Sequence, residues 1–316
     1  MEHRWLLAGV MWVTAVGLSW AEPGSCLPGK GCRDEPNWLD RSHSALSDRT
    51  ERLAVSLDRF FGLDDSAEEA ARSFVRLRGS VGYDHLDGGD AKLSVKGQWH
   101  LPRTDERIGL VFSDGEEGDE LDARTDTDRA VGLQFEQRRD RRLGRFGLRL
   151  TLRSRAKLRT ELRYRISSLP APNAVRLGGL ASLWWQDGRG VGVTFGGTVE
   201  KSLNSRNLVR YSARVERAED FEGVQWEQTV ALSSQLSLRD ASVAFLRFTG
   251  ETEPVAFTRS VALGLLYRRQ VFRQWMFMEI EPVFDWRRPD HDEPRELAPS
   301  IVLRIEWQLG DPPVLW

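Results

Sequence analysis

The stretch "KLRTELRYRIS", residues 157–167, alternates between two kinds of side chain without a break. Mostly apolar residues take one parity, and they are Leu158, Thr160, Leu162, Tyr164 and Ile166. Charged residues take the other parity, and they are Lys157, Arg159, Glu161, Arg163 and Arg165. A β-strand places these two sets on opposite faces. The stretch therefore predicts a strand with one apolar face and one face dense in arginines.

The same two-residue period recurs from about residue 73 onward, in segments separated by turn residues. The segments are 74–83, 92–101, 107–113, 130–137, 146–154, 157–167, 175–185, 191–200, 208–216, 224–234, 242–250, 260–269, 275–286 and 300–310. Regularly spaced alternating segments are typical of antiparallel hairpins. We therefore expect about fourteen strands, with twelve to fourteen as the range.

The connecting segments differ in length and charge. The stretches 204–207 and 238–241 are short, whereas 113–128 and 287–299 are longer and acidic. Short turns at one end and longer polar loops at the other are typical of a transmembrane β-barrel. The acidic residues of 113–128 could hold a divalent cation, but their order does not match a calcium-binding loop, and a solvated loop is the simpler interpretation.

An apolar face beside an arginine-rich face fits a barrel in a lipid bilayer. Lipid offers no hydrogen bonds to the backbone, so a sheet in a membrane must close on itself, with an apolar outer face and a polar lumen. Aromatic residues of outward parity would form the interfacial girdles, and they are Tyr164, Trp185, Tyr211, Trp226, Tyr267, Trp286 and Trp307. A soluble β-sandwich would also alternate, but its structure gives no reason for so many arginines.

The N-terminus reads as an export signal. A basic start is followed by an apolar run from Trp5 to about Leu18, and Ser19 and Ala21 precede a possible cleavage site before Glu22. The alternative is a membrane anchor, although the run is short for a bilayer span. We therefore expect a signal peptide over 1–21.

Residues 22–72 differ from the alternating region. Cys26 and Cys32 are the two cysteines of the chain, and in an exported protein they predict a local disulfide; two cysteines alone would make an incomplete metal site. Within 33–72, Leu46, Leu53 and Leu57 with Phe60 or Phe61 recur at helical spacing. We expect a periplasmic segment with an amphipathic helix, followed by a barrel domain over 73–316.

Signal peptide and barrel together resemble the outer-membrane β-barrel proteins of Gram-negative bacteria as a general class. The resemblance implies an outer-membrane location, contact with outer-membrane lipid and lipopolysaccharide, and insertion by the barrel-assembly machinery. In that class the last strand usually ends on an aromatic residue that this machinery reads. Here the chain continues past Trp307 to Trp316, so either residue could carry that signal.

The charged parity suggests a function. The residues expected to line the lumen are Arg149, Arg153, Lys157, Arg159, Glu161, Arg163, Arg165, Glu227, Glu279, Glu281, Asp285, Arg304 and Glu306. In a ring of about fourteen strands, the basic early strands would lie opposite the acidic late ones. An open lumen of this kind predicts a porin-like channel for small polar or anionic solutes. The alternative is a non-conducting barrel with a structural or envelope-interaction role, closed by arginine–carboxylate bridges or by the N-terminal helix.

Other functions have weaker support. The formal net charge is −2, which does not favour nucleic acid as a partner. An outer-membrane hydrolase would need catalytic groups at the rim, where His85 and His291 are expected to lie beside acids, but no nucleophile motif is present. The sequence indicates no cofactor and no metal site.

Overall fold

The computed structural model describes the region from 74 to 310 with several gaps. The described parts are 74–100, 108–114, 130–138, 144–153, 156–171, 175–288 and 290–310, together with Leu53, Ser56, Leu57, Phe60 and Phe61 of a helix. The predicted signal peptide (1–21), the Cys26–Cys32 loop, most of the 22–72 segment, the acidic stretch after Asp114 and Trp316 lie outside the described residues. Within the described part, no helix has the length and apolar character needed to cross a membrane.

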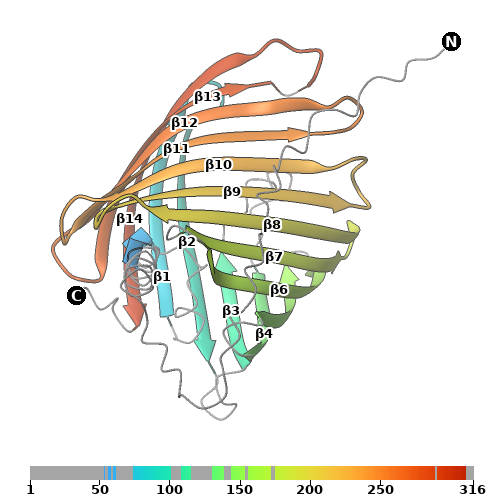
Figure 1. Ribbon diagram of the computed structural model, residues 1–316, viewed down its shortest axis with the longest axis horizontal. Coiled ribbons are helices and arrows are strands. Elements are labelled where there is room, and N and C mark those ends of the chain that lie inside the picture. Colours follow the sequence, from blue (N-terminus) through green and yellow to red (C-terminus); the bar gives the residue numbers. More distant parts are fainter. Residues whose placement is uncertain are drawn as a thin grey trace, which may run out of the picture.

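The described strands form one closed antiparallel barrel (Figure 1). The strands are β1 (Phe74–Asp84), β2 (Gly88–His100), β3 (Ile108–Asp114), β4 (Ala130–Arg138), β5 (Arg145–Arg153), β6 (Leu158–Ala171), β7 (Val175–Gln186), β8 (Gly190–Ser202), β9 (Asn207–Ala218), β10 (Gln225–Gln235), β11 (Asp240–Glu251), β12 (Phe257–Gln270), β13 (Met276–Arg287) and β14 (Glu296–Gly310). Each strand pairs with its neighbours in sequence, and β14 returns to pair with β1. The expected all-β fold of about fourteen strands is confirmed.

The closing pair is continuous. It runs in register from Phe74 opposite Gly310 to Asp84 opposite Ser300. A closed barrel leaves no strand edge with unpaired backbone groups, which is the condition for a sheet inside a bilayer. Register shifts occur at two places, in the β6–β7 pair after Ile166 and in the β11–β12 pair after Thr249.

The outer face of the barrel is apolar. In the opening stretch, Leu162 is 48% exposed, whereas Glu161 beside it is 7% exposed. The same contrast recurs on β5 and β14, where Leu148 and Leu303 are exposed. Exposed leucines at every second position would be unfavourable in water and are favourable against lipid. The parity of the sequence therefore separates a lipid-facing outer surface from a polar inner surface.

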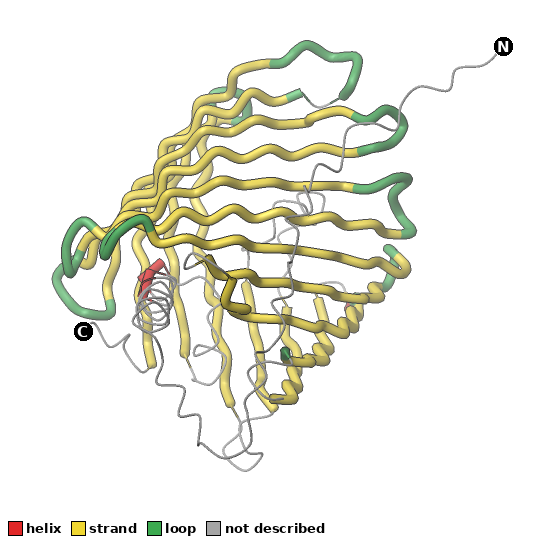
Figure 2. The backbone as a smooth tube through the Cα atoms, in the orientation of Figure 1, coloured by secondary structure: helices red, strands yellow, loops and turns green. Residues whose placement is uncertain are grey.

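Connectors of different lengths join the strands at the ends of the barrel (Figure 2). Because neighbouring strands run in opposite directions, the connectors after odd-numbered strands share one end, here called the loop end. The strand ends that flank 115–129 and those that flank 288–295 are both at the loop end. Short turns also occur there, at 85–87 and 187–189, so length alone does not distinguish the ends. The opposite end, where β1 begins and β14 finishes, is here called the N-terminal end.

A small apolar core lies inside the barrel at its N-terminal end. It joins Leu53, Leu57, Phe60 and Phe61 of the helix to inner residues of the wall, which are Leu208, Ala241 and Phe277. Figure 2 shows the described helix residues in red near the strand ends. The full burial of one such side chain contributes roughly 1.5–3 kcal/mol relative to exposure. These contacts hold the helix against the inner wall.

Candidate functional site

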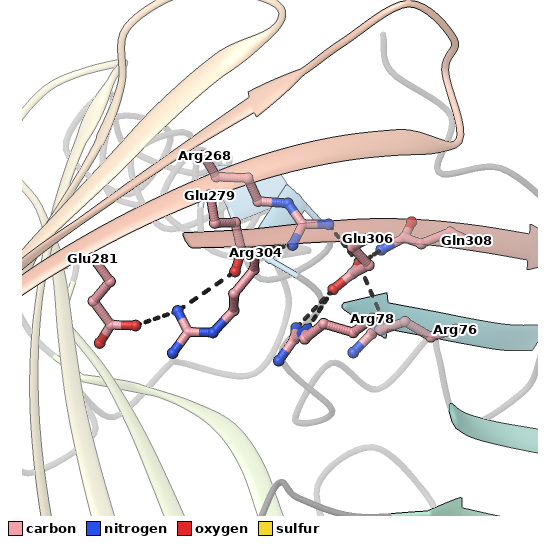
Figure 3. Close-up of polar contacts among 8 residues, drawn as sticks. All are labelled: Arg76, Arg78, Arg268, Glu279, Glu281, Arg304, Glu306 and Gln308. Atoms are coloured by element: carbon pink, nitrogen blue, oxygen red, sulfur yellow. Dashed lines mark hydrogen bonds and ion pairs between the residues drawn. The ribbon is translucent and has the colours of Figure 1, made fainter. Parts of the chain in front are cut away.

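The inner surface near the N-terminal end carries a cluster of charges centred on Glu306 (Figure 3). Arg78 donates two hydrogen bonds to Oε2 of Glu306, from Nε at 3.0 Å and from Nη2 at 2.7 Å. Arg268 Nη2 and Gln308 Nε2 each donate to Oε1 at 2.7 Å. Arg76 Nε lies 3.4 Å from the same oxygen. The carboxylate of Glu306 is fully buried, so its charge is met by protein groups instead of water.

The strand register explains why these groups meet. Arg78 stands directly opposite Glu306 across the β1–β14 pair that closes the barrel. Arg268 stands opposite Glu279 in the β12–β13 pair. Side chains of directly opposed residues lie on the same face with their Cβ atoms about 5 Å apart. The cluster therefore spans β12, β13, β14 and β1 and bridges the closing seam.

Arg268 is the most enclosed cation of the cluster. Its side chain is 0% exposed, it hydrogen-bonds to Glu279 and Glu306, and its guanidinium lies 4.1 Å from the ring centroid of Phe277. Burial of a charge is costly unless partners satisfy it, and removal of one partner from such a pair typically costs about 3–5 kcal/mol. The cluster thus makes the fold sensitive to the loss of any one member.

The other predicted carboxylates of β13 also have arginine partners. Arg304 Nη1 donates to Glu281 and lies 3.8 Å from Glu279 Oε2. Arg287 Nε donates to Asp285 at 2.8 Å. The carboxylates of Glu279, Glu281 and Asp285 are therefore paired with arginines of the same or a neighbouring strand, which reduces the charge that they present to the lumen.

Arg287 extends this network to the loop end. Its Nη2 donates to Asp84 at 2.6 Å and its Nη1 donates to Asp87 at 2.8 Å. Ser260 donates a hydrogen bond to Asp285. The network ties β12, β13 and β1 together near the rim.

Glu227 on β10 has a different environment. It accepts a hydrogen bond from Thr229 Oγ1 at 3.5 Å, and its second oxygen, Oε2, is buried without a hydrogen-bond partner among the described residues. Its register neighbour on β9 is Arg214. Among the described residues, the hydrogen-bond donor to Glu227 is therefore a hydroxyl group, whereas Glu279 and Glu306 bond to an arginine.

The inner wall formed by β5 and β6 holds its arginines differently. Arg149 donates to the amide oxygen of Gln134 from Nε at 3.1 Å and from Nη2 at 2.6 Å. Arg163 donates to Glu161 Oε1 at 3.1 Å and 2.9 Å, along the same strand face. The Arg163 side chain remains 31% exposed. These contacts fix the directions of the guanidinium groups while leaving part of their surface open.

Arg159 rests on an aromatic ring. Its guanidinium lies 4.5 Å from the ring centroid of Trp184, and its Nη1 donates to Gln186 at 3.2 Å. The indole Nε1 of Trp184 donates to Thr194 Oγ1 at 3.3 Å, and Thr194 donates to Glu216 at 3.0 Å. A chain of contacts across β6, β7, β8 and β9 therefore positions Arg159.

The remaining residues expected in the lumen are Arg153, Lys157 and Arg165. All three are partly buried and share the parity of Arg149 or Arg159. Arg165 stands opposite Arg145 at the N-terminal end of the β5–β6 pair. These cations extend the arginine-rich surface along the height of the two strands.

The rim histidines lie in turns of the loop end. His291 places Nδ1 at 2.7 Å from Asp290 and Nε2 at 3.2 Å from Asp292. The hydrogen bond with His291 lowers the pKa of the exposed Asp290 carboxyl. For His85, the backbone N–H donates to the carbonyl of Pro299 at 3.0 Å. Since both ring nitrogens of His291 face carboxylates, this geometry does not favour the hydrolase expected as an alternative.

No group of three or more His, Cys, Asp or Glu side chains with the geometry to hold a metal ion occurs among the residues that the structure describes. The acidic stretch between 115 and 128, where the sequence raised a divalent cation, lies outside them.

Sequence reasoning missed the large side chains of the inner surface. Trp184 and Phe277 are each 1% exposed and lie on inner parity, as does Leu208. They could have been predicted as large apolar residues at inner positions, where the neighbouring strands carry charged residues. Phe277 and Leu208 are each the second residue of an odd-numbered strand. Both therefore lie at the N-terminal end of the barrel.

Comparisons with known proteins give a likeness of fold. No protein-family model matches the chain, and no curated protein matches it. Among solved structures, the anion-selective porin from Comamonas acidovorans is 9% identical, with a TM-score of 0.46, covering 75% of this chain and 98% of that one. The loop L8 deletion mutant of OmpT, an outer membrane protein of Vibrio cholerae, is 11% identical, with a TM-score of 0.45, covering 75% and 98%. The KdgM porin in complex with disordered oligogalacturonate is 6% identical, with a TM-score of 0.39, covering 73% and 98%.

The architecture itself identifies the class of protein. The fourteen strands close without an edge, the outer surface is apolar, and the charged side chains gather on the inner surface. Lipid favours this arrangement and water does not. The chain is a β-barrel protein of the outer membrane.

Proposed function

We propose that the protein is a passive outer-membrane channel for small polar solutes and that it favours anions. The proposal rests on one observation, the arrangement of charge along the inner faces of β5 and β6. The inner positions of these strands carry Arg145, Arg149, Arg153, Arg159, Arg163 and Arg165, with Glu161 as their carboxylate. This surface has a large excess of positive formal charge.

The opposite wall has a much smaller net charge. In the ring order, β12 and β13 lie across the barrel from β5 and β6. On β13 and the adjoining β14, Glu279, Glu281 and Glu306 are paired with Arg268, Arg304 and Arg78 of adjacent strands. A lumen with one cationic wall and one largely neutralised wall would lower the energy of an anion more than that of a cation.

Conductance in planar lipid bilayers tests the proposal. Folded protein should give stepwise conductance increments in potassium chloride, and vesicles that contain it should admit small sugars but exclude large ones. The control is heat-denatured protein at the same concentration. A complete lack of conductance from protein whose barrel fold is verified by circular dichroism and by heat-modifiable gel mobility would refute the channel.

The second candidate is a non-conducting barrel with a structural or envelope-interaction role. The observation that favours it is the Glu306 cluster, in which three arginines and a glutamine surround one buried carboxylate. Such pairing fills and rigidifies part of the interior. In the bilayer experiment, this candidate predicts folded and inserted protein without ion current.

A further inference from the structure

The inner wall contains an apolar patch where the polar parity is interrupted. Leu208 on β9, Ala241 on β11 and Phe277 on β13 are each 1% exposed, and the partly buried Val243 and Leu266 pack beside them. The three wall residues occupy the second positions of strands that begin at the N-terminal end. An apolar patch inside a water-filled lumen is unfavourable unless something covers it.

The helix of the same chain covers this patch. Leu53, Leu57, Phe60 and Phe61 are buried, and Phe60 meets Phe277 edge-on with the ring centroids 5.7 Å apart. Phe61 stands edge-on to Phe60 at 5.5 Å. The wall and the helix therefore form one packed contact, and the helix lies inside the N-terminal mouth.

The docked helix also borders the Glu306 cluster. The guanidinium of Arg268 lies 5.9 Å from the ring centroid of Phe60 and 4.1 Å from that of Phe277. Arg268 at the same time bonds to Glu306, which Arg78 of β1 also contacts. The aromatic rings thus lie against Arg268, the cation that joins the helix site to the closing seam of the barrel. Figure 3 shows the bonds of Arg268 to the seam. A rigid wall beneath the helix favours a single docked position.

We infer that the helix bearing Leu53, Leu57, Phe60 and Phe61 is a fixed constriction of the N-terminal mouth of the pore and that Leu57 and Phe60 hold it against the inner wall. This inference rests on the proposed channel function. The helix occupies the side formed by β9 to β13, so solutes pass between it and the arginine-rich wall of β5 and β6.

Simple geometry gives the expected size of the effect. Fourteen strands spaced about 4.8 Å apart and tilted by about 40° enclose a circular barrel with a backbone diameter of roughly 28 Å. Inner side chains reduce the free width to roughly 18 Å. A helix with its side chains is about 10 Å across and so takes up roughly a third of the free cross-sectional area. Removal of the helix from the mouth should therefore raise the conductance about 1.5-fold.

The test compares undocking variants with a matched control in the full-length chain. Leu57→Gln combined with Phe60→Gln should weaken the contact from the helix, and Leu208→Gln should weaken it from the wall. Phe272→Gln is the control, because Phe272 lies in a turn at the same end and is 92% exposed. Both kinds of undocking variant should raise single-channel conductance about 1.5-fold and admit larger sugars into vesicles, while Phe272→Gln should match the wild type.

A labelling experiment separates docking from conductance. In a Cys26→Ser, Cys32→Ser background, the thiol introduced by Ala241→Cys, on the wall beneath the helix, should react slowly with a bulky maleimide, and the thiol introduced by Phe272→Cys should react quickly. Rapid labelling of the first thiol would overturn the docked helix. A protected thiol together with unchanged conductance in both undocking variants would overturn the constriction while the channel stands. If neither wild type nor variants conduct, the proposed channel fails, and the labelling result still reports on docking.

Discussion

Arginines on the two sides of the barrel have different partners. On β12, β14 and β1, Arg268, Arg304 and Arg78 bond to carboxylates, and Arg268 and Glu306 are fully buried. On β5 and β6, Arg149 bonds to an amide, and Arg163 shares Glu161 along its own strand while keeping exposed surface. The comparison indicates that one set of charges holds the closing strands together. Under the proposed channel function, the other set would face the path of solutes.

The largest expected effect comes from the buried side. Glu306→Ala would leave Arg76, Arg78 and Arg268 close together without their shared carboxylate. The free energy of unfolding should fall by about 3–5 kcal/mol, because buried cations would lose their partner. Guanidinium-induced unfolding of protein in lipid vesicles measures it. Glu222→Ala, in an exposed turn, is the control; a loss below about 1 kcal/mol for Glu306→Ala would mean that the cluster does not stabilise the seam.

The second-largest effect is expected for the Trp184 ring, which supports Arg159 on the arginine-rich side. A Cβ atom at Gly192 would lie 2.1 Å from Trp184, the ring on which Arg159 rests. Gly192→Ala should therefore displace Trp184 and lower the free energy of unfolding by about 1–3 kcal/mol. Gly79→Ala is the matched control, since its added Cβ would meet nothing within 4 Å. Equal stability of the two variants in the same unfolding assay would show that Trp184 yields without cost.

Much of the fold, and part of the charged inner surface, could be predicted from the alternation of residues along the strands. Each of the fourteen predicted segments overlaps one strand, with differences of a few residues at the ends, because period-two patterning and turn residues are local signals. Parity also placed Arg163 and Glu161 on one face, where the structure has their hydrogen bond. The partners of Arg268 and Glu306 could not be anticipated in this way, because they depend on register between strands, including a closing pair that joins the two ends of the barrel sequence. The start of β2 at Gly88 was missed as well, since Gly88, Gly89 and Asp90 carry no alternating signal.

A smaller free-energy change should appear as a change in ion selectivity. A unit charge about 6 Å from the ion path in water changes the energy of each ion by about 0.7 kcal/mol. The reversal in Arg149→Glu shifts the anion and the cation by about 1.4 kcal/mol in opposite directions, so it should lower the anion-to-cation permeability ratio about a hundredfold at low salt. Reversal potentials under a potassium chloride gradient measure it. Arg217→Glu, on the exposed outer face of β9, should leave the ratio unchanged. If both variants shift the ratio equally, the selectivity does not come from the β5–β6 wall.

The smallest effect is expected for the exposed pair of Asp290 and His291 at the rim. The pKa of Asp290 is lowered by its hydrogen bond with His291, so this contact stabilises the fold above the ordinary pKa of the carboxyl and is lost as the pH falls through the lowered value. His291→Ala should move the Asp290 titration midpoint upward in an NMR pH series and leave the stability near neutral pH almost unchanged. A large loss of stability in His291→Ala would contradict this, because it would mean that the exposed contact stabilises the fold. Loss of a lipid- or peptide-hydrolysing activity would favour the hydrolase instead.

The reversal potential of the wild-type protein tests the central claim most directly. With the folded barrel in a planar bilayer between unequal concentrations of potassium chloride, the account predicts a current whose reversal potential has the sign of chloride selectivity. It also predicts that this selectivity weakens as the salt concentration rises, because salt screens the arginines of the lumen. A reversal potential of the opposite sign, or folded protein that carries no current, would contradict it.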